Sequence, residues 1–316
     1  MHGFFWVVGD RRSASTESMY VEWEAPAEVT KPWPIVLVHG GGGQGTDWLG
    51  TPDGRPGWAP LLVAQGWAVY VVDRPGHGRS PRSGRRSGPP ATLDMIAGTF
   101  AAGTDERHTQ WPGPGGADDP AVAQLAASAV PLAADLADAQ AVEAERLAAL
   151  LDQIGPAVLI THSFGAPAGW LTADLRPDLV RAVVALEPFG PPFLRLPEAG
   201  IALDWGLTSA RLTYEPEAAA AADLDPGRPR SLPNLRGFPI AVVEAEASVA
   251  AAACAPTAEF LRTAGADVTH LRLAEHGVRG NGHGFIVERN NDAALAAVLA
   301  WLEPALRVFQ NQQEHS

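Results

Sequence analysis

The sequence lacks several features that would direct it to particular classes of protein. Cys254 is the only cysteine in 316 residues, which excludes an internal disulfide and any metal site built from several thiolates. No apolar run approaches the roughly 20 residues that a membrane-spanning helix needs. The net charge is −13 and the arginines are scattered, which disfavours nucleic acid or an anionic membrane as a partner. We therefore expect a soluble globular protein that acts on a small molecule.

The N-terminus also lacks the pattern of a secretory signal. The first ten residues show no basic start followed by a long apolar stretch and a small-residue cleavage site. Together with the single cysteine, which suits a reducing compartment, this predicts a cytoplasmic protein. A mature secreted chain is the alternative.

Short β-branched runs alternate along the chain with longer segments rich in alanine and leucine. This alternation is typical of an α/β protein with a mainly parallel sheet, whose buried strands are continuously apolar. The predicted strands are residues 19–24, 35–38, 68–72, 157–160, 182–186, 240–243 and 268–273. Helical spacing of apolar residues predicts flanking helices over 140–154 and 292–302. The length favours one decorated domain over residues 1–316.

Two stretches interrupt this alternation. Residues 99–120 are rich in glycine and proline, and residues 191–233 mix prolines, aromatic residues and a run of alanines. Long irregular segments inside a domain often serve as lids or binding loops. We predict that both are lid or cap insertions over the edge of the sheet, the alternative being surface excursions. The polar tail at 310–316 is expected to fray.

The sharpest local motif is the segment 157–169, in which an apolar strand runs into Ser163 and then into a helix of small residues. Such a turn presents a nucleophilic serine at its apex, and the helix N-terminus favours developing negative charge. The turn needs small residues two positions on either side of the serine. Gly165 meets this need, whereas Thr161 is bulkier and weakens the motif. The alternative is a serine that only caps the helix.

A glycine-rich loop at residues 39–45 follows the predicted strand 35–38. Glycine lets the backbone approach a substrate closely, so that main-chain N–H groups can stabilise the oxyanion of a tetrahedral intermediate. We assign one donor to the N–H of Phe164, directly after the nucleophile, and the other to Gly41 or Gly42.

The same loop supports a competing interpretation. Gly40, Gly42 and Gly45 have the spacing of a dinucleotide-binding fingerprint, and Asp73 ends a later strand, as in a nicotinamide-dependent oxidoreductase. That fingerprint must open a helix directly, whereas the prolines and glycines of residues 47–58 predict a loop. We therefore favour the oxyanion interpretation, with no organic cofactor and no metal.

His283 lies on a glycine-rich loop between the last predicted strand and the C-terminal helix, where it can reach a serine as general base. His276 is the fallback. The acid that would orient the imidazole could come from either of two strand ends. Glu187 follows one predicted strand, and Glu244 and Glu246 follow the next one. Spacing alone leaves this choice open, and the later strand is the commoner site.

Taken together, these segments resemble the α/β-hydrolase superfamily, and within it a bacterial esterase branch whose acid follows the sixth strand. The resemblance covers nearly the whole chain and rests on residues 39–42, 51–58, 73–80, 161–163, 187–188 and 280–283. It implies an α/β-hydrolase fold and a triad of Ser163, Glu187 and His283, in the chain order usual for that fold. It thereby selects Glu187 over Glu246. It also favours a homodimer.

The implied activity is that of a serine hydrolase that cleaves a carboxylic ester of a small, apolar substrate through an acyl-enzyme. Lactones, amides and carbon–carbon bonds are alternative targets of the same triad, and a non-catalytic ligand-binding relative is an alternative of another class. The side chains of His162, Phe189, Trp205 and Phe285 are predicted to line the substrate pocket.

Overall fold

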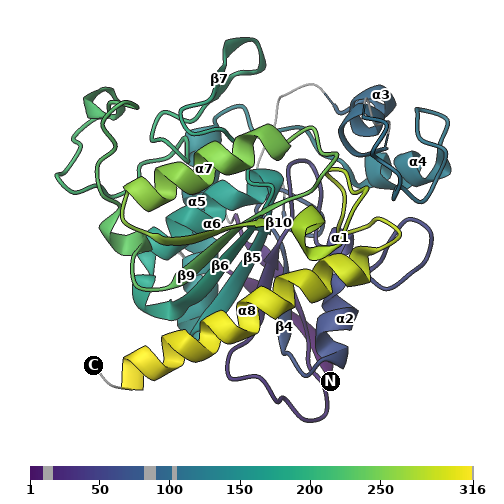
Figure 1. Cartoon of the computed structure of the whole chain (residues 1–316), viewed down its shortest axis with the longest axis horizontal. Coiled ribbons are helices and arrows are strands. Elements are labelled where there is room, and N and C mark those ends of the chain that lie inside the picture. The colour runs from purple at the N-terminus through teal and green to yellow at the C-terminus, as the bar shows by residue number, and fades with distance from the viewer. Residues whose placement is uncertain (10–16, 82–89, 102–104, 315–316) are drawn as a thin grey trace.

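The computed structural model describes residues 1–9, 17–81, 90–101 and 105–314, which are organised around an eight-stranded sheet (Figure 1). The strands of this sheet are β1 His2–Val7, β2 Met19–Glu24, β3 Ile35–Val38, β4 Val69–Asp73, β5 Ala157–His162, β6 Val180–Leu186, β9 Pro239–Glu244 and β10 Asp267–Arg272. A separate hairpin consists of β7 Arg195–Leu196 and β8 Ile201–Ala202.

The strand order is β1-β2-β4-β3-β5-β6-β9-β10. β2 pairs antiparallel with β1 and with β4, and the pairs from β4 to β10 are parallel. The predicted mainly parallel sheet is thus confirmed. Parallel strands bring their carboxyl ends to the same edge of a sheet, so the segments that follow β3, β5 and β6 meet there.

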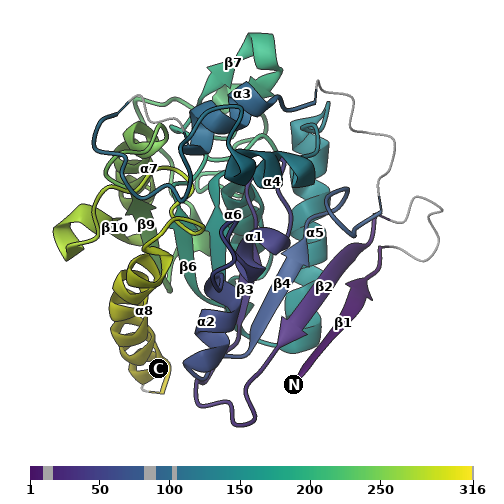
Figure 2. The same cartoon turned by 90° about the vertical axis from the view of Figure 1, so that its right-hand side faces the viewer.

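Helices cover both faces of the sheet (Figures 1 and 2). They are α1 Thr46–Leu49, α2 Trp58–Ala64, α3 Leu93–Ile96, α4 Pro120–Ser128, α5 Leu136–Ile154, α6 Ala166–Leu175, α7 Ala251–Thr263 and α8 Asn291–Glu314, and α3 continues into a π-turn at Ala97–Ala101. α3, α4 and the β7–β8 hairpin gather at one end of the sheet (Figure 2). Among the described residues, no helix combines the length and the apolarity needed to cross a membrane.

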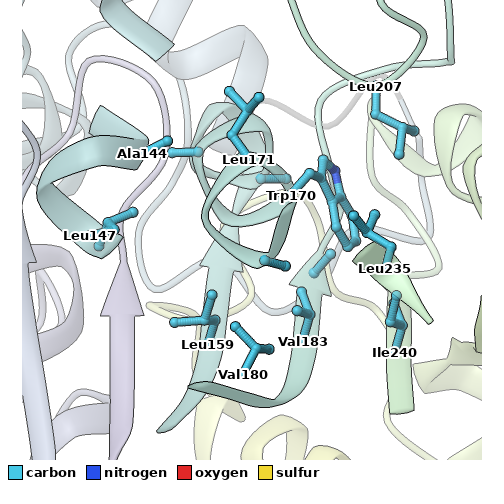
Figure 3. Packing of buried hydrophobic residues seen from close by; sticks show 14 of the residues in the cluster. Ala144, Leu147, Leu159, Trp170, Leu171, Val180, Val183, Leu207, Leu235 and Ile240 are labelled. Atoms are coloured by element: carbon cyan, nitrogen blue, oxygen red, sulfur yellow. The ribbon is translucent and has the colours of Figure 1, made fainter. Parts of the chain in front are cut away.

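Alternate side chains of the central strands divide the core into two parts. Val36 and Val38 of β3 pack with α5 and α6, whereas Ile35 and Leu37 pack with α2 and α8. This is the two-residue period of a strand that is buried on both faces. On the α6 side, the indole of Trp170 packs beside Leu235 (Figure 3). The continuously apolar runs in the sequence are therefore explained by two buried faces.

Three local predictions need correction. β1 is an edge strand that the sequence analysis does not predict, because its apolar residues follow one another without clean alternation. The tail expected to fray continues α8 to Glu314, since Leu306 and Phe309 anchor it in the core; residues 315 and 316 lie outside the described residues. The loop predicted at 47–58 contains most of α1.

The packing of α5 on the sheet leads to a prediction on stability. Leu147 is 1% exposed in this contact, so Leu147→Ala removes buried methyl groups and leaves a cavity. We expect a loss of about 2–5 kcal/mol in the free energy of unfolding, measured by urea titration followed by circular dichroism. The matched control is Leu175→Ala, at a residue that is 45% exposed, and should change stability far less. Equal effects of both variants would contradict the assigned packing.

Candidate active site

Ser163 occupies the turn between β5 and α6. Its φ is 50°, in the left-handed region that a residue with a side chain rarely adopts. The turn is tight, because a Cβ at Gly165 would overlap the carbonyl oxygen of His39, in the loop after β3. Only glycine fits at position 165. The serine is thereby held at the carboxyl edge of the sheet in a strained conformation, which is common at functional sites.

The bulk of Thr161, the residue that weakens the motif in the sequence, is accommodated by a glycine on the neighbouring helix. A Cβ at Gly169 would lie 2.7 Å from Cγ2 of Thr161, so the missing side chain on α6 makes room for the threonine methyl group. Thr161 itself is completely buried. The turn therefore needs one small residue at this contact, and here the helix rather than the strand supplies it.

The structure brings Ser163, His283 and Glu187 into one chain of hydrogen bonds. Oγ of Ser163 lies 3.0 Å from Nε2 of His283, and Nδ1 of His283 lies 2.7 Å from Oε2 of Glu187. The three residues are 8%, 5% and 0% exposed. This geometry suits a neutral imidazole that donates its Nδ1–H to a carboxylate and accepts the serine proton at Nε2.

Glu187 follows β6 with a φ of 44° and is held by two further donors. The N–H of Ala245 donates to Oε1 at 2.9 Å, and the hydroxyl of Ser248 donates to Oε2. Burial raises the pKa of Glu187, and these two hydrogen bonds act in the opposite direction because they stabilise the anion. The sequence analysis missed Ser248, which has no motif of its own.

Burial also lowers the pKa of His283, since water that would solvate an imidazolium is excluded, while the charge of Glu288 acts in the opposite direction. The imidazole is therefore neutral near pH 7. A neutral imidazole in hydrogen-bond contact with a serine hydroxyl has the protonation state and position of a general base.

The glycine loop after β3 is fixed beside Ser163. The guanidinium of Arg74 donates to the carbonyl of Gly40 at 2.6 Å, and forms a buried ion pair with Glu143 at 3.0 Å. A Cβ at Gly41 would lie 2.7 Å from the ring of Phe164, so glycine is needed for this close approach. The glycine loop therefore packs closely against residue 164, and that its N–H groups receive an oxyanion stays a prediction.

A cavity of about 470 Å³ has Ser163 and His283 in its wall. Its apolar lining includes Met95, Ile96, Phe100, Leu125, Val130 and Leu132. Asp47 also faces it, and burial raises the pKa of this carboxyl group to about 7. The described residues contain no cluster of three or more side chains placed to hold a metal ion. The cavity is therefore lined mainly by apolar side chains, with Ser163 and His283 among its polar groups.

A sequence model of the family described as "alpha/beta hydrolase fold" matches residues 34–236. The chain belongs to the α/β-hydrolase family. It is 39% identical over 332 residues to "Probable secreted lipase phiG" of Fungal sp. (strain ATCC 74256), covering 95% of this chain and 89% of that protein. It is also similar in structure to "The Atomic Resolution Structure of a Novel Bacterial Esterase", with a TM-score of 0.71, 23% identity and coverage of 97% and 96% of the two chains.

Within this α/β-hydrolase fold, the alternative candidates for the acid and the base have other partners or lie on the surface. Glu244 pairs with His270 at 2.8 Å, and Glu246 pairs with Arg279 at 3.0 Å. His276 is exposed at the end of a short 3₁₀ turn. The contact with His283 is instead made by Glu187, the acid that the resemblance implies.

The residues predicted to line the pocket divide into two groups. His162 lines the cavity, as do Gly41, Gly42 and Phe164. The cavity wall does not include the other three predicted residues.

Phe189 stacks on the ring of Phe164, with 3.7 Å between the ring centroids, and so packs against a residue of the cavity wall. Phe285 is fully buried, with its ring packed against that of Trp58. Trp205 packs within the insertion, where its carbonyl accepts a hydrogen bond from the hydroxyl of Tyr214.

The roof of the cavity comes largely from residues that the sequence analysis did not assign to it. They lie in α3, at the end of α4, and in residues 129–134. Of the described parts of the predicted lids, residues 99 and 100 of the first and residues 198 and 199 of the second line the cavity. The apolar run at 129–134 is the one sequence feature that could have indicated this part of the cavity wall. That these segments move as a lid stays a prediction.

The buried His162 gives a prediction for acid stability. Its Nε2 lies 3.0 Å from the carbonyl oxygen of His283, and burial lowers its pKa from 6.5 to about 3. The unfolded chain therefore binds a proton as the pH falls below 6.5, whereas the folded chain does so near pH 3, and stability is lost across this interval.

For His162 this loss is about 2 kcal/mol between about pH 7.5 and about pH 5. His162→Gln keeps an amide donor for the carbonyl but cannot titrate. We expect the free energy of unfolding of the variant to fall by that much less over the same interval, as measured by urea titration at both pH values. Parallel pH dependences of variant and wild type would exclude a buried neutral histidine here.

Proposed function

We propose that this α/β-hydrolase is a serine hydrolase that cleaves carboxylic esters of small apolar substrates through an acyl-enzyme intermediate on Ser163. The proposal is supported chiefly by the hydrogen bonds that connect Ser163 Oγ with His283 and His283 with Glu187. Ser163 and His283 line the apolar cavity. A relative named as a lipase supports ester hydrolysis as the general reaction.

In the proposed first step, Oγ of Ser163 attacks the ester carbonyl carbon while Nε2 of His283 takes its proton. The carbonyl oxygen becomes an oxyanion that faces the N–H groups of Phe164 and of Gly41 or Gly42. The tetrahedral intermediate collapses, the bond to the alcohol oxygen breaks, and His283 returns the proton to the leaving alcohol. Water then attacks the acyl-serine by the same route and releases the acid.

Glu187 has an electrostatic role in this scheme. His283 becomes an imidazolium in each transition state, in a site from which water is excluded, and such a charge is costly without a nearby anion. The carboxylate at 2.7 Å from Nδ1 stabilises it and holds the ring in the tautomer that leaves Nε2 free. The donors from Ala245 and Ser248 keep the carboxylate oriented.

The substrate class follows from the cavity. An apolar chamber of about 470 Å³ suits an acyl or alcohol group of several carbon atoms, because burial of apolar surface supplies the binding free energy. The cytoplasmic location and the homodimer expected from the sequence stay predictions. The fungal relative is named as a probable secreted protein.

The nucleophile can be tested directly. Ser163→Ala should abolish labelling by a fluorophosphonate probe and lower kcat for p-nitrophenyl butyrate by about 10⁴-fold or more, because no other oxygen is in contact with Nε2 of His283 among the described residues. Ser231→Ala, which removes a hydroxyl in the distant insertion, is the matched control and should label and turn over like the wild type. Undiminished labelling of the Ser163 variant would refute the proposal.

The acid can be tested by a matched pair of substitutions. Glu187→Gln should lower kcat by about 10²- to 10⁴-fold, since the amide cannot stabilise the imidazolium as an anion does. Glu246→Gln removes the same charge from a residue paired with Arg279 and should retain most of the activity, because its amide oxygen can still accept the hydrogen bond from the N–H of Gly280. Steady-state rates on p-nitrophenyl acetate and butyrate decide the matter, and a larger loss in Glu246→Gln would move the acid to the later strand.

A further inference from the structure

A second buried carboxylate, that of Glu288, holds the loop that carries His283. Glu288 is 0% exposed. It accepts hydrogen bonds from the N–H of Gly282 at 3.0 Å and from the side-chain amide of Asn281 at 2.9 Å. The residue directly before the proposed general base is thus fixed by a charged group that the mechanism above does not use.

The same carboxylate also contacts the first predicted lid segment (99–120), called the cap below. Nε2 of His108 lies 2.7 Å from Oε1 of Glu288, and the side chain of this histidine is 4% exposed. A Cβ at Gly282 would lie 2.7 Å from the ring of His108, so the loop and the cap segment are in close contact. Two backbone N–H groups, those of Thr109 and Gln110, donate to the carbonyl of Gly280. Glu288 and the carbonyl of Gly280 therefore join residues 108–110 to the loop of His283.

We propose that Glu288 is a positioning residue for His283, which ties the 280–283 loop to the cap and places a second negative charge near the imidazole. The inference rests on the proposed function, since it assigns Glu288 a part in the same reaction. It differs from the role of Glu187, because Glu288 does not contact the imidazole ring and acts through the loop and through space.

The negative charge of Glu288 distinguishes a role in positioning His283 from a purely structural role. An ionised carboxylate is expensive to bury, and a neutral side chain of the same size could hold the same loop. The negative charge of Glu288 raises the pKa of His283, against the effect of burial. The other titratable groups facing His283 are Glu187 after β6 and His162 of β5, and His108 is the one that faces Glu288.

The test is Glu288→Gln, which keeps the size and shape of the side chain and removes its charge. We expect kcat for p-nitrophenyl butyrate to fall about tenfold, with KM changed by less than about twofold, because the imidazolium loses an anion only as it forms. The acid limb of kcat/KM should shift to lower pH by roughly half to one unit, since loss of a negative charge lowers the pKa of His283.

Two further variants make the result specific. Glu288→Asp keeps the charge on a shorter side chain, so the acid limb should return toward the wild-type midpoint even where kcat stays reduced, and this variant also decides the question if Glu288→Gln does not fold. Glu275→Gln removes an exposed carboxylate from the 3₁₀ turn at 273–276 and should leave kcat and the midpoint unchanged.

An unchanged kcat and midpoint in Glu288→Gln would overturn the inference. So would a fall in kcat with an unshifted midpoint and a lowered melting temperature, because that pattern marks a merely structural residue. The proposed function fails separately, if the wild type neither hydrolyses the ester nor takes up the fluorophosphonate on Ser163.

Discussion

The site depends on one buried hydrogen bond, between Nδ1 of His283 and Oε2 of Glu187. The two residues are 96 positions apart and both are buried, so an imidazolium formed at His283 during the reaction has the carboxylate of Glu187 as its neighbouring anion. Parallel strands solve this problem, because they bring the segment after β6 to the edge where β5 delivers Ser163. The sheet, the donors from Ala245 and Ser248, and the loop of His283 all serve to keep this bond in place.

Close approach of backbone segments is the second requirement, and it explains which residues are small. Ser163 and Glu187 both adopt positive φ values, a strain that the packed sheet has to hold. Gly165 admits the loop after β3, and Gly169 admits the methyl group of Thr161. The serine turn is therefore specified by several contacts around it, and a motif restricted to five residues describes only part of them.

Local pattern predicted most of the strands, the serine turn and the general position of His283, since these features depend on a few adjacent residues. The choice of Glu187 needed the family resemblance, because Glu187 and Glu246 both end a strand and only long-range packing turns one toward His283. Prediction of the aromatic pocket failed for Phe189, Trp205 and Phe285, since nearness along the chain does not fix the direction of a side chain. Glu288 and His108 are 180 residues apart, so no local signal could join them.

The central claim is that Ser163 attacks a carbonyl group in a cavity whose backbone N–H groups receive the oxyanion. The most direct test is a crystal structure of the protein with an alkyl boronic acid, which forms a tetrahedral adduct with a nucleophilic serine. We expect a bond from boron to Oγ of Ser163, one boronate oxygen facing the N–H groups of Phe164 and the glycine loop, and the alkyl group in the apolar cavity. A boronate bound elsewhere, with Ser163 Oγ unmodified, would contradict this claim.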